Sequence, residues 1–214
     1  RDLEQWYFRI TDYAQQLLDD LDTVDWPERV VVQQRNWIGR SEGVEFAMDI
    51  VERDGEPVIG SDGEPLGFRV FTTRPDTGFG MTFCVLAPEH PLVGTITAPD
   101  RRDEVQRFIE RARRTSEIDR MSTERDLAER GCFTGAFARN PFTGRAVPVY
   151  LADYVLATYG TGAVMAVPGE DQRDWEFATA YGLEIIQTVA RPAGWEGEAY
   201  DGDGTLINSR FLDG

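Results

Sequence analysis

Three threonines surround a short charged turn and could supply hydroxyl groups to a small polar site. Thr72 and Thr73 end an apolar stretch, and Thr77 comes directly after Arg74-Pro75-Asp76. Hydroxyls and β-branched side chains grouped in this way could form the wall of a small pocket. The structural alternative is a plain turn, because threonine is common in strands, Asp-Thr is common at turns, and Arg74 and Asp76 could form an ion pair that holds the loop.

Two carboxylates form a second polar group. Asp171 and Asp174 lie three residues apart at the predicted start of a helix, where the positive end of the helix dipole favours the ionised form. An ionised carboxylate is a good anchor for an ammonium group, so the pair predicts binding of an amino acid through its α-amine. The structural alternative is a capping box, in which Asp171 caps the helix and Asp174 reaches back to it.

The side chains of conventional catalysis are missing. All 22 basic residues are arginine, and the single histidine, His90, lies in a turn-like segment predicted to be a solvated loop. The Gly-Thr-Gly segment at 160–162 completes no phosphate-binding motif. Cys84 and Cys132 lack the spacing of a zinc site or a redox pair, which favours a reduced cytosolic protein. Any hydrolysis must therefore rely on positioning and polar stabilisation.

Sequence periodicity predicts the elements that position these groups. Helices are predicted from Leu3 to Leu21, from Asp100 as N-cap to Ala112, at 122–130, and at 171–181 with Gly182 after its end, whereas 29–34 is predicted to be extended. Strands are predicted at 44–51, 68–73, 82–86, 147–151, 163–167 and 184–190, with turns at 54–57 and 62–65. Strands outnumber helices without alternating with them, so we expect an α+β fold with a mostly antiparallel, β-barrel-like core and peripheral helices.

Charge and hydropathy restrict the possible partners. The formal net charge of −16 argues against a broad electrostatic grip on nucleic acid, so any nucleic acid is expected to be held elsewhere or touched only at an end. The apolar runs are far shorter than the roughly 20 residues of a membrane-spanning helix. The first residues lack the pattern of a signal peptide, and we expect a cytoplasmic location.

The two polar segments together resemble the editing domain of leucyl-tRNA synthetase. The 72–77 segment, Thr-Thr-Arg-Pro-Asp-Thr, is similar to the threonine-rich motif of that domain. The 159–174 segment, from Tyr-Gly-Thr-Gly-Ala to Asp-Gln-Arg-Asp, is similar to its second signature. The Arg-Pro-Asp-Thr form favours leucine over the sister synthetases for valine and isoleucine, whose editing domains are the alternative. A non-catalytic module that binds a nucleotide end is a further alternative.

The resemblance implies a hydrolase that removes a wrong amino acid from the 3′-terminal adenosine of tRNA(Leu), without a metal or other cofactor. Asp174, Thr72, Thr73 and Thr77 would be catalytic: Asp174 would bind the α-ammonium group, Thr72 and Thr73 would position the carbonyl and the water, and Thr77 would exclude leucine. The substrate-binding residues would be Arg74, Asp76, Tyr159, Met165, Val167 and Asp171.

The resemblance also implies how the chain is organised. Residues 1–35 would be an amphipathic helix and linker left from the neighbouring synthetase body, and 36–214 the editing domain, expected to be a monomer when isolated. The rest of the parent synthetase would be a partner, because the chain lacks both motifs of amino acid activation. Two departures from the family, Glu170 in place of histidine and Gly78 in place of a bulky residue, predict a wider or differently charged outer wall.

Overall fold

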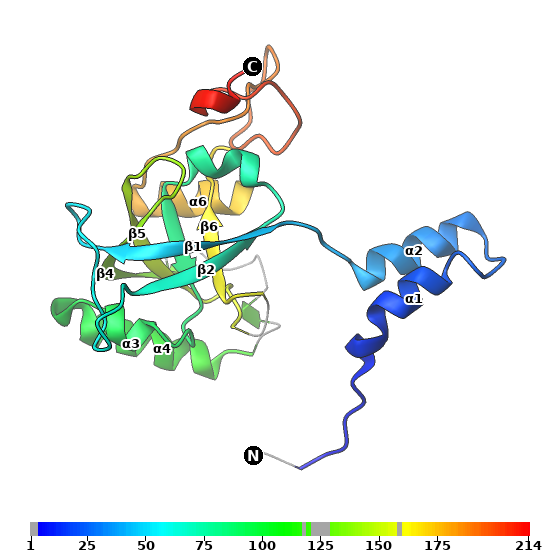
Figure 1. Ribbon diagram of the computed structural model, residues 1–214, viewed down its shortest axis with the longest axis horizontal. Helices are drawn as coiled ribbons and strands as arrows, with labels where there is room; N and C mark the ends of the chain where they lie inside the picture. Colours follow the sequence, from blue (N-terminus) through cyan, green and yellow to red (C-terminus); the bar gives the residue numbers. More distant parts are fainter. Residues whose placement is uncertain (1–3, 117–118, 121–128, 158–159) are drawn as a thin grey trace. The chain divides into compact units, whose positions relative to one another are not determined.

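The computed structural model in Figure 1 describes residues 4–116, 119–120, 129–157 and 160–214. The chain divides into two compact units, Arg1–Glu42 and Gly43–Gly214. The first unit contains η1 (Ile10–Tyr13), a 3-10 turn that leads into α1 (Ala14–Asp20), and then α2 (Glu28–Ile38). The predicted helix from Leu3 to Leu21 is therefore shorter than expected: residues 4–9 are not helical, and Leu3 lies outside the described residues.

The prediction of an extended segment at 29–34 is wrong, because these residues belong to α2. Pro27 precedes the first turn, Glu28 lies within it, and Gly39 follows the last turn with a left-handed φ of 63°. These end signals match the preferences of helix termini. They outweigh the strand preference of the three valines at 30–32, which had suggested an extended chain.

The second unit is built on one six-stranded sheet in the order β2-β1-β4-β5-β3-β6. Its strands are β1 (Val44–Val51), β2 (Gly67–Thr72), β3 (Phe83–Leu86), β4 (Gly131–Arg139), β5 (Ala146–Ala152) and β6 (Ala163–Ala166). Every neighbouring pair is antiparallel except β3 with β5. The mostly antiparallel α+β prediction is confirmed. The sheet is not closed by hydrogen bonds, although its two outer strands, β2 and β6, approach each other (Figure 1).

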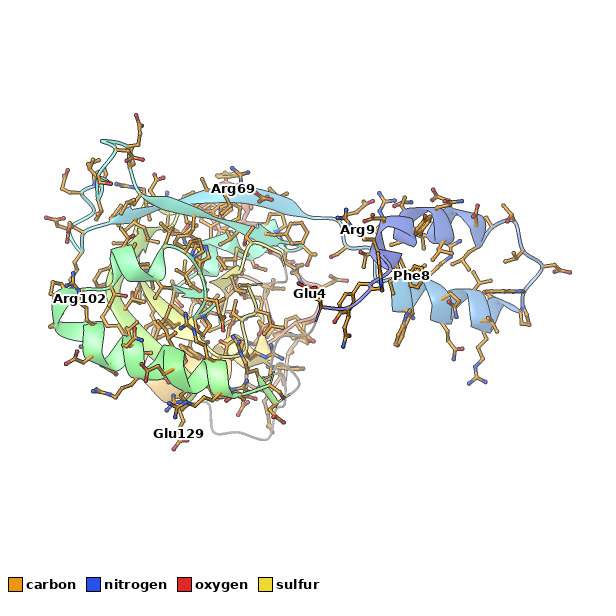
Figure 2. The ribbon with its side chains drawn as sticks, turned by 90° about the horizontal axis from the view of Figure 1, so that it is seen from below. Glu4, Phe8, Arg9, Arg69, Arg102 and Glu129 are labelled. Carbon is orange, nitrogen blue, oxygen red and sulfur yellow. The ribbon has the colours of Figure 1, made fainter. Side chains whose placement is uncertain are left out.

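Helices cover this sheet on the outside, as predicted. They are α3 (Val93–Ile96), η3 (Pro99–Arg101), α4 (Arg102–Arg114) and α6 (Gln172–Tyr181), with η5 (Arg210–Leu212) near the C-terminus. The predicted N-cap, Asp100, instead lies within η3, and Arg101 precedes α4, whose first residue, Arg102, is labelled in Figure 2. The predicted 171–181 helix is confirmed as α6, which buries Phe177 between the rings of Phe83, at 5.2 Å, and Tyr181, at 4.4 Å.

Two strand predictions failed for physical reasons. No strand was predicted at β4, whose inward positions carry the small residues Cys132, Thr134, Ala136 and Ala138 rather than the large apolar residues that mark a strand. The predicted strand at 184–190 forms only one isolated bridge, between Val189 and Leu206. The predicted helix at 122–130 lies almost entirely outside the described residues.

The strands β1 and β2 pair as an antiparallel hairpin, and its turns lie where the sequence predicted them. Phe46 pairs with Val70 and Met48 with Phe68, so both strands present large apolar side chains to the same core. In each turn the aspartate side chain accepts a hydrogen bond from the backbone N–H two residues later. This Asx-turn geometry explains why the Asp-Gly-Glu-Pro sequence occurs twice.

Replacing Phe177 tests the contribution of the α6 contact to stability. We expect Phe177→Ala to lower the free energy of unfolding by about 3–5 kcal/mol, because the ring is fully buried between two others. Urea denaturation followed by circular dichroism measures the loss. Phe71→Ala is the matched control, because Phe71 is 40% exposed and should contribute under about 1 kcal/mol. Equal losses in the two variants would contradict this account of the core.

Candidate functional site

The threonine segment forms a tight loop between β2 and β3. Thr72 ends β2, and its Oγ1 accepts a hydrogen bond from the Arg74 N–H at 3.0 Å. The chain then enters η2 (Pro75–Gly80), where the Thr77 hydroxyl donates to the Arg74 carbonyl at 2.9 Å. Thr77 is fully buried, whereas Thr73 is exposed. The loop therefore holds Thr77 in one orientation and leaves Thr73 accessible.

Arg74 and Asp76 form the ion pair that the structural alternative predicted. Arg74 Nη2 lies 2.9 Å from Asp76 Oδ2, and Arg74 Nε also donates to this carboxylate. The hydrogen bond from Arg74 lowers the pKa of Asp76. Because both side chains are more than a third exposed, the pair contributes little to overall stability. Its effect is local, since it fixes the conformation at the start of η2.

The second signature lies on β6 and the turn that follows it. Met165 and Val167 are buried in the main core, and β6 pairs with β3 along its whole length. Beyond the end of this ladder, the Thr82 N–H donates to the Ala166 carbonyl at 3.2 Å. The chain that leaves η2 is thereby joined to the strand that leads to Asp171 and Asp174. Tyr159 lies outside the described residues.

Asp171 and Asp174 make different hydrogen bonds. Asp171 is the N-cap of α6, and its Oδ1 accepts from the Asp174 N–H at 3.0 Å. Asp174 does not complete the capping box: its Oδ2 accepts from the Val167 N–H at 2.8 Å, and the side chain is only 6% exposed. The capping interpretation is therefore right for Asp171, while Asp174 is directed to the turn after β6.

The expectation that Asp174 is ionised is wrong for the protein alone. Burial raises the pKa of Asp174 to about 8, and the charge of Asp171 raises it further, against the lowering by the Val167 N–H and Arg173. A helix dipole stabilises a carboxylate by about 0.3–1 kcal/mol, or about 2 kcal/mol when partly buried. Burying an unpaired charge costs more than this. Burial therefore favours the protonated acid over the carboxylate in the protein alone.

Glu170 has a structural task that its sequence context did not predict. Its Oε1 accepts hydrogen bonds from the N–H groups of Thr188, at 2.5 Å, and Val189, at 3.1 Å. These donors are thus unavailable for a sheet ladder, which explains why no strand forms at 184–190. Burial raises the pKa of Glu170. The carboxylate serves the packing of this segment against the start of α6.

The space next to Gly78 is occupied by another side chain. A Cβ atom at Gly78 would lie 2.4 Å from Cε2 of Phe142, so this ring already fills the adjacent space. Phe142 belongs to the turn between β4 and β5, which sequence analysis had not connected with the threonine loop. The ring of Phe142 therefore takes the space that a side chain at position 78 would need.

His90 lies in the predicted turn but is half-buried. Its Nδ1 accepts from the Leu92 N–H at 3.3 Å, and its ring meets Phe68 edge to face. Burial lowers the pKa of His90.

In the described part of the chain, no helix is long and apolar enough to span a membrane. Those residues also contain no group of three or more histidine, cysteine, aspartate or glutamate side chains arranged to hold a metal ion.

The raised pKa of Asp174 predicts a specific pH dependence of stability. Since the folded-state pKa exceeds the ordinary value of 3.8, the contribution of this group is fully present below 3.8 and is lost as pH rises to about 8. The slope from one such group is at most about 1.4 kcal/mol per pH unit. We expect Asp174→Asn to abolish that slope and to be more stable than wild type at pH 8. Urea denaturation across this range measures it, with Thr134→Val as a non-titrating control; parallel curves for Asp174→Asn and wild type would contradict the assignment.

Comparisons with a family model and with known proteins point to the same family. Residues 35–214 match the family model described as the editing domain of leucyl-tRNA synthetase. The chain is 53% identical over 218 residues to the leucine–tRNA ligase of Rubrobacter xylanophilus and 53% identical over 219 residues to that of Gloeobacter violaceus. Both alignments cover 100% of this chain, which spans only 25% and 24% of the length of these relatives.

A solved structure is similar in fold as well as sequence. It is the crystal structure of the ternary complex of Agrobacterium radiobacter K84 agnB2 LeuRS with tRNA and LeuAMS, with a TM-score of 0.62 and 32% identity. The match covers 99% of this chain and 23% of that one. With the threonine loop and the buried aspartate joined through β3 and β6, these matches show that the chain belongs to the family of leucyl-tRNA synthetase editing domains.

Proposed function

We propose that the chain hydrolyses the ester bond between a wrong amino acid, of the norvaline or isoleucine type, and the 3′-terminal adenosine of tRNA(Leu). A synthetic site cannot reject competitors that differ from leucine by one methylene or a shifted branch by more than about 10–200-fold. A second site that accepts these competitors and excludes leucine corrects the remaining errors. The family match to an editing domain supports this role.

The observation that carries the proposal is the buried acid at the turn after β6, which backbone hydrogen bonds connect to the chain that leaves the threonine loop. Asp174 accepts from the Val167 N–H, and the neighbouring Ala166 carbonyl accepts from Thr82, a few residues beyond Thr77. Among the described residues, the hydrogen bond to the Asp174 carboxyl group comes from a backbone N–H, and a buried carboxyl group with a pKa of about 8 is suited to an α-ammonium group. When that group binds, Asp174 releases its proton and gains a charged partner.

The reaction then requires positioning rather than a nucleophilic side chain. Water attacks the ester carbonyl, the bond to the ribose oxygen breaks, and the products are the free amino acid and a tRNA with a free terminal hydroxyl. Thr72 and the exposed Thr73 would orient the carbonyl and the water. Fixed polar groups of this kind contribute to rate by orientation and by stabilising developing charge.

Rejection of leucine would come from Thr77. Its β-branched side chain has few rotamers, and its hydroxyl is fixed to the Arg74 carbonyl at 2.9 Å. A side chain held in this way cannot move aside for a larger substrate. Met165 and Val167, both buried in the main core, would provide the apolar wall against which a smaller side chain packs.

The partner would be the 3′ end of tRNA(Leu), with most of the tRNA held by other parts of a larger synthetase. The net charge of −16 disfavours an extensive phosphate contact by this chain itself. The chain would act as a monomer when isolated. A non-catalytic module that binds a nucleotide end is the competing proposal, and turnover separates the two.

Loss of hydrolysis in an Asp174 variant tests the proposed activity. We expect the chain to release norvaline from norvalyl-tRNA(Leu), and Asp174→Asn to lower kcat/KM by at least about 100-fold, because the anchor for the ammonium group loses its charge. Release of labelled norvaline measures the rate, and circular dichroism verifies the fold. Absence of turnover by wild type would leave the non-catalytic module as the better proposal, and full activity of Asp174→Asn would refute the anchoring role.

A second prediction concerns selectivity. Thr77→Ala should hydrolyse leucyl-tRNA(Leu) at a rate approaching that for norvalyl-tRNA(Leu), because the side chain that excludes leucine is removed. Thr77→Ser is the matched control for the hydroxyl, since it keeps the bond to Arg74 and loses only the methyl group. Unchanged protection of leucyl-tRNA(Leu) by Thr77→Ala would contradict steric exclusion.

A further inference from the structure

A single buried amide connects the β4–β5 turn with the threonine loop. Asn140 is fully buried, and its Nδ2 donates to the carbonyls of Gly78 and Met81, each at 3.1 Å. Its Oδ1 accepts from the N–H groups of Phe142, at 2.8 Å, and Thr143, at 3.2 Å. This network sets the orientation of the amide, because two backbone donors face the oxygen and two carbonyls face the nitrogen.

The two contacts to Gly78 and Met81 bracket the end of η2. Thr77 directly precedes Gly78, so the carbonyl that Asn140 holds belongs to the next peptide unit along the chain. The ring of Phe142, from the same turn, lies where a Cβ of Gly78 would be, and it also meets Phe79 at 5.8 Å. The hydrogen bonds of Asn140 and the ring of Phe142 therefore both restrain Gly78, and together they contact the 78–81 segment.

We propose that Asn140 is a positioning residue that determines selectivity, because it holds Thr77 in the place from which leucine is excluded. This rests on the proposed function, in which Thr77 is the excluding side chain. The Arg74 contact fixes Thr77 from its N-terminal side, and Asn140 fixes the peptide on its C-terminal side. Steric exclusion requires that Thr77 keep its position when a substrate binds. Loss of either contact should therefore admit the leucine side chain.

Asn140→Asp separates this role from the folding of the turn. The aspartate keeps both acceptor bonds to Phe142 and Thr143, but even as the protonated acid it has one hydrogen for the Gly78 and Met81 carbonyls, where the amide had two. We expect the ratio of kcat/KM for norvalyl-tRNA(Leu) to that for leucyl-tRNA(Leu) to fall at least about tenfold. Thr134→Val is the control, because it removes a buried hydrogen bond to the Val149 carbonyl in the middle of the sheet; it should lower stability and keep the ratio.

A double variant shows whether Asn140 acts through Thr77. If it does, adding Asn140→Asp to Thr77→Ala should change the ratio by less than about twofold, because the excluding side chain is already gone. Independent effects that multiply would overturn the proposal. So would a folded Asn140→Asp variant that protects leucyl-tRNA(Leu) as wild type does. A wild-type chain that hydrolyses neither ester would instead refute the proposed function, and this inference with it.

Gly78→Ala tests the same inference if Asn140→Asp does not fold. Its new Cβ would press on the Phe142 ring from 2.4 Å and displace η2 without touching the amide. We expect the same fall in the ratio of the two kcat/KM values. Full protection of leucyl-tRNA(Leu) by Gly78→Ala would show that the site tolerates movement next to Thr77, which the proposal forbids.

Discussion

The antiparallel pairing of β3 with β6 is the contact on which the site depends. The threonine loop ends at the start of β3, and the aspartate turn begins at the end of β6, so these two short strands bring together groups that are distant in the sequence. The Thr82 to Ala166 hydrogen bond extends this pairing to the edge of the site. A ladder fixes the register of its strands, because a slip by one residue would turn Met165 away from the core.

Burial decides the chemistry of Asp174. The residue occupies a helix start, a position that stabilises negative charge, and its neighbour Asp171 has the ordinary role of an N-cap. Because Asp174 is turned inward to the Val167 N–H, loss of solvation dominates and raises its pKa to about 8. In the proposed function, this raised pKa suits Asp174 to a cationic ligand, because binding would restore the charge together with a partner.

Polar side chains replace sheet ladders in the irregular parts of the second unit. Glu170 accepts from two consecutive backbone donors in the 188–189 segment, and Asn140 satisfies two carbonyls of the threonine loop. Buried backbone groups need partners, and an irregular loop cannot supply them by itself. Such side chains define one conformation for segments that have no regular structure.

Local pattern was enough for much of this protein. Alternation of apolar residues predicted β1, Gly-flanked periodicity predicted α6, and the Asp-Gly-Glu-Pro repeats predicted both hairpin turns, because each depends on residues within a few positions of one another. The threonine and aspartate motifs likewise indicated the family.

The sequence pattern did not predict β4, where small inward residues suffice because Phe108 and Val105 of α4 fill the space opposite. It failed again at 184–190, where Glu170 takes the backbone donors. The protonation of Asp174, the closure behind Gly78 by Phe142 and the clamp made by Asn140 emerged only from the tertiary structure, since solvation and hydrogen-bond partners are supplied by segments far away in the chain.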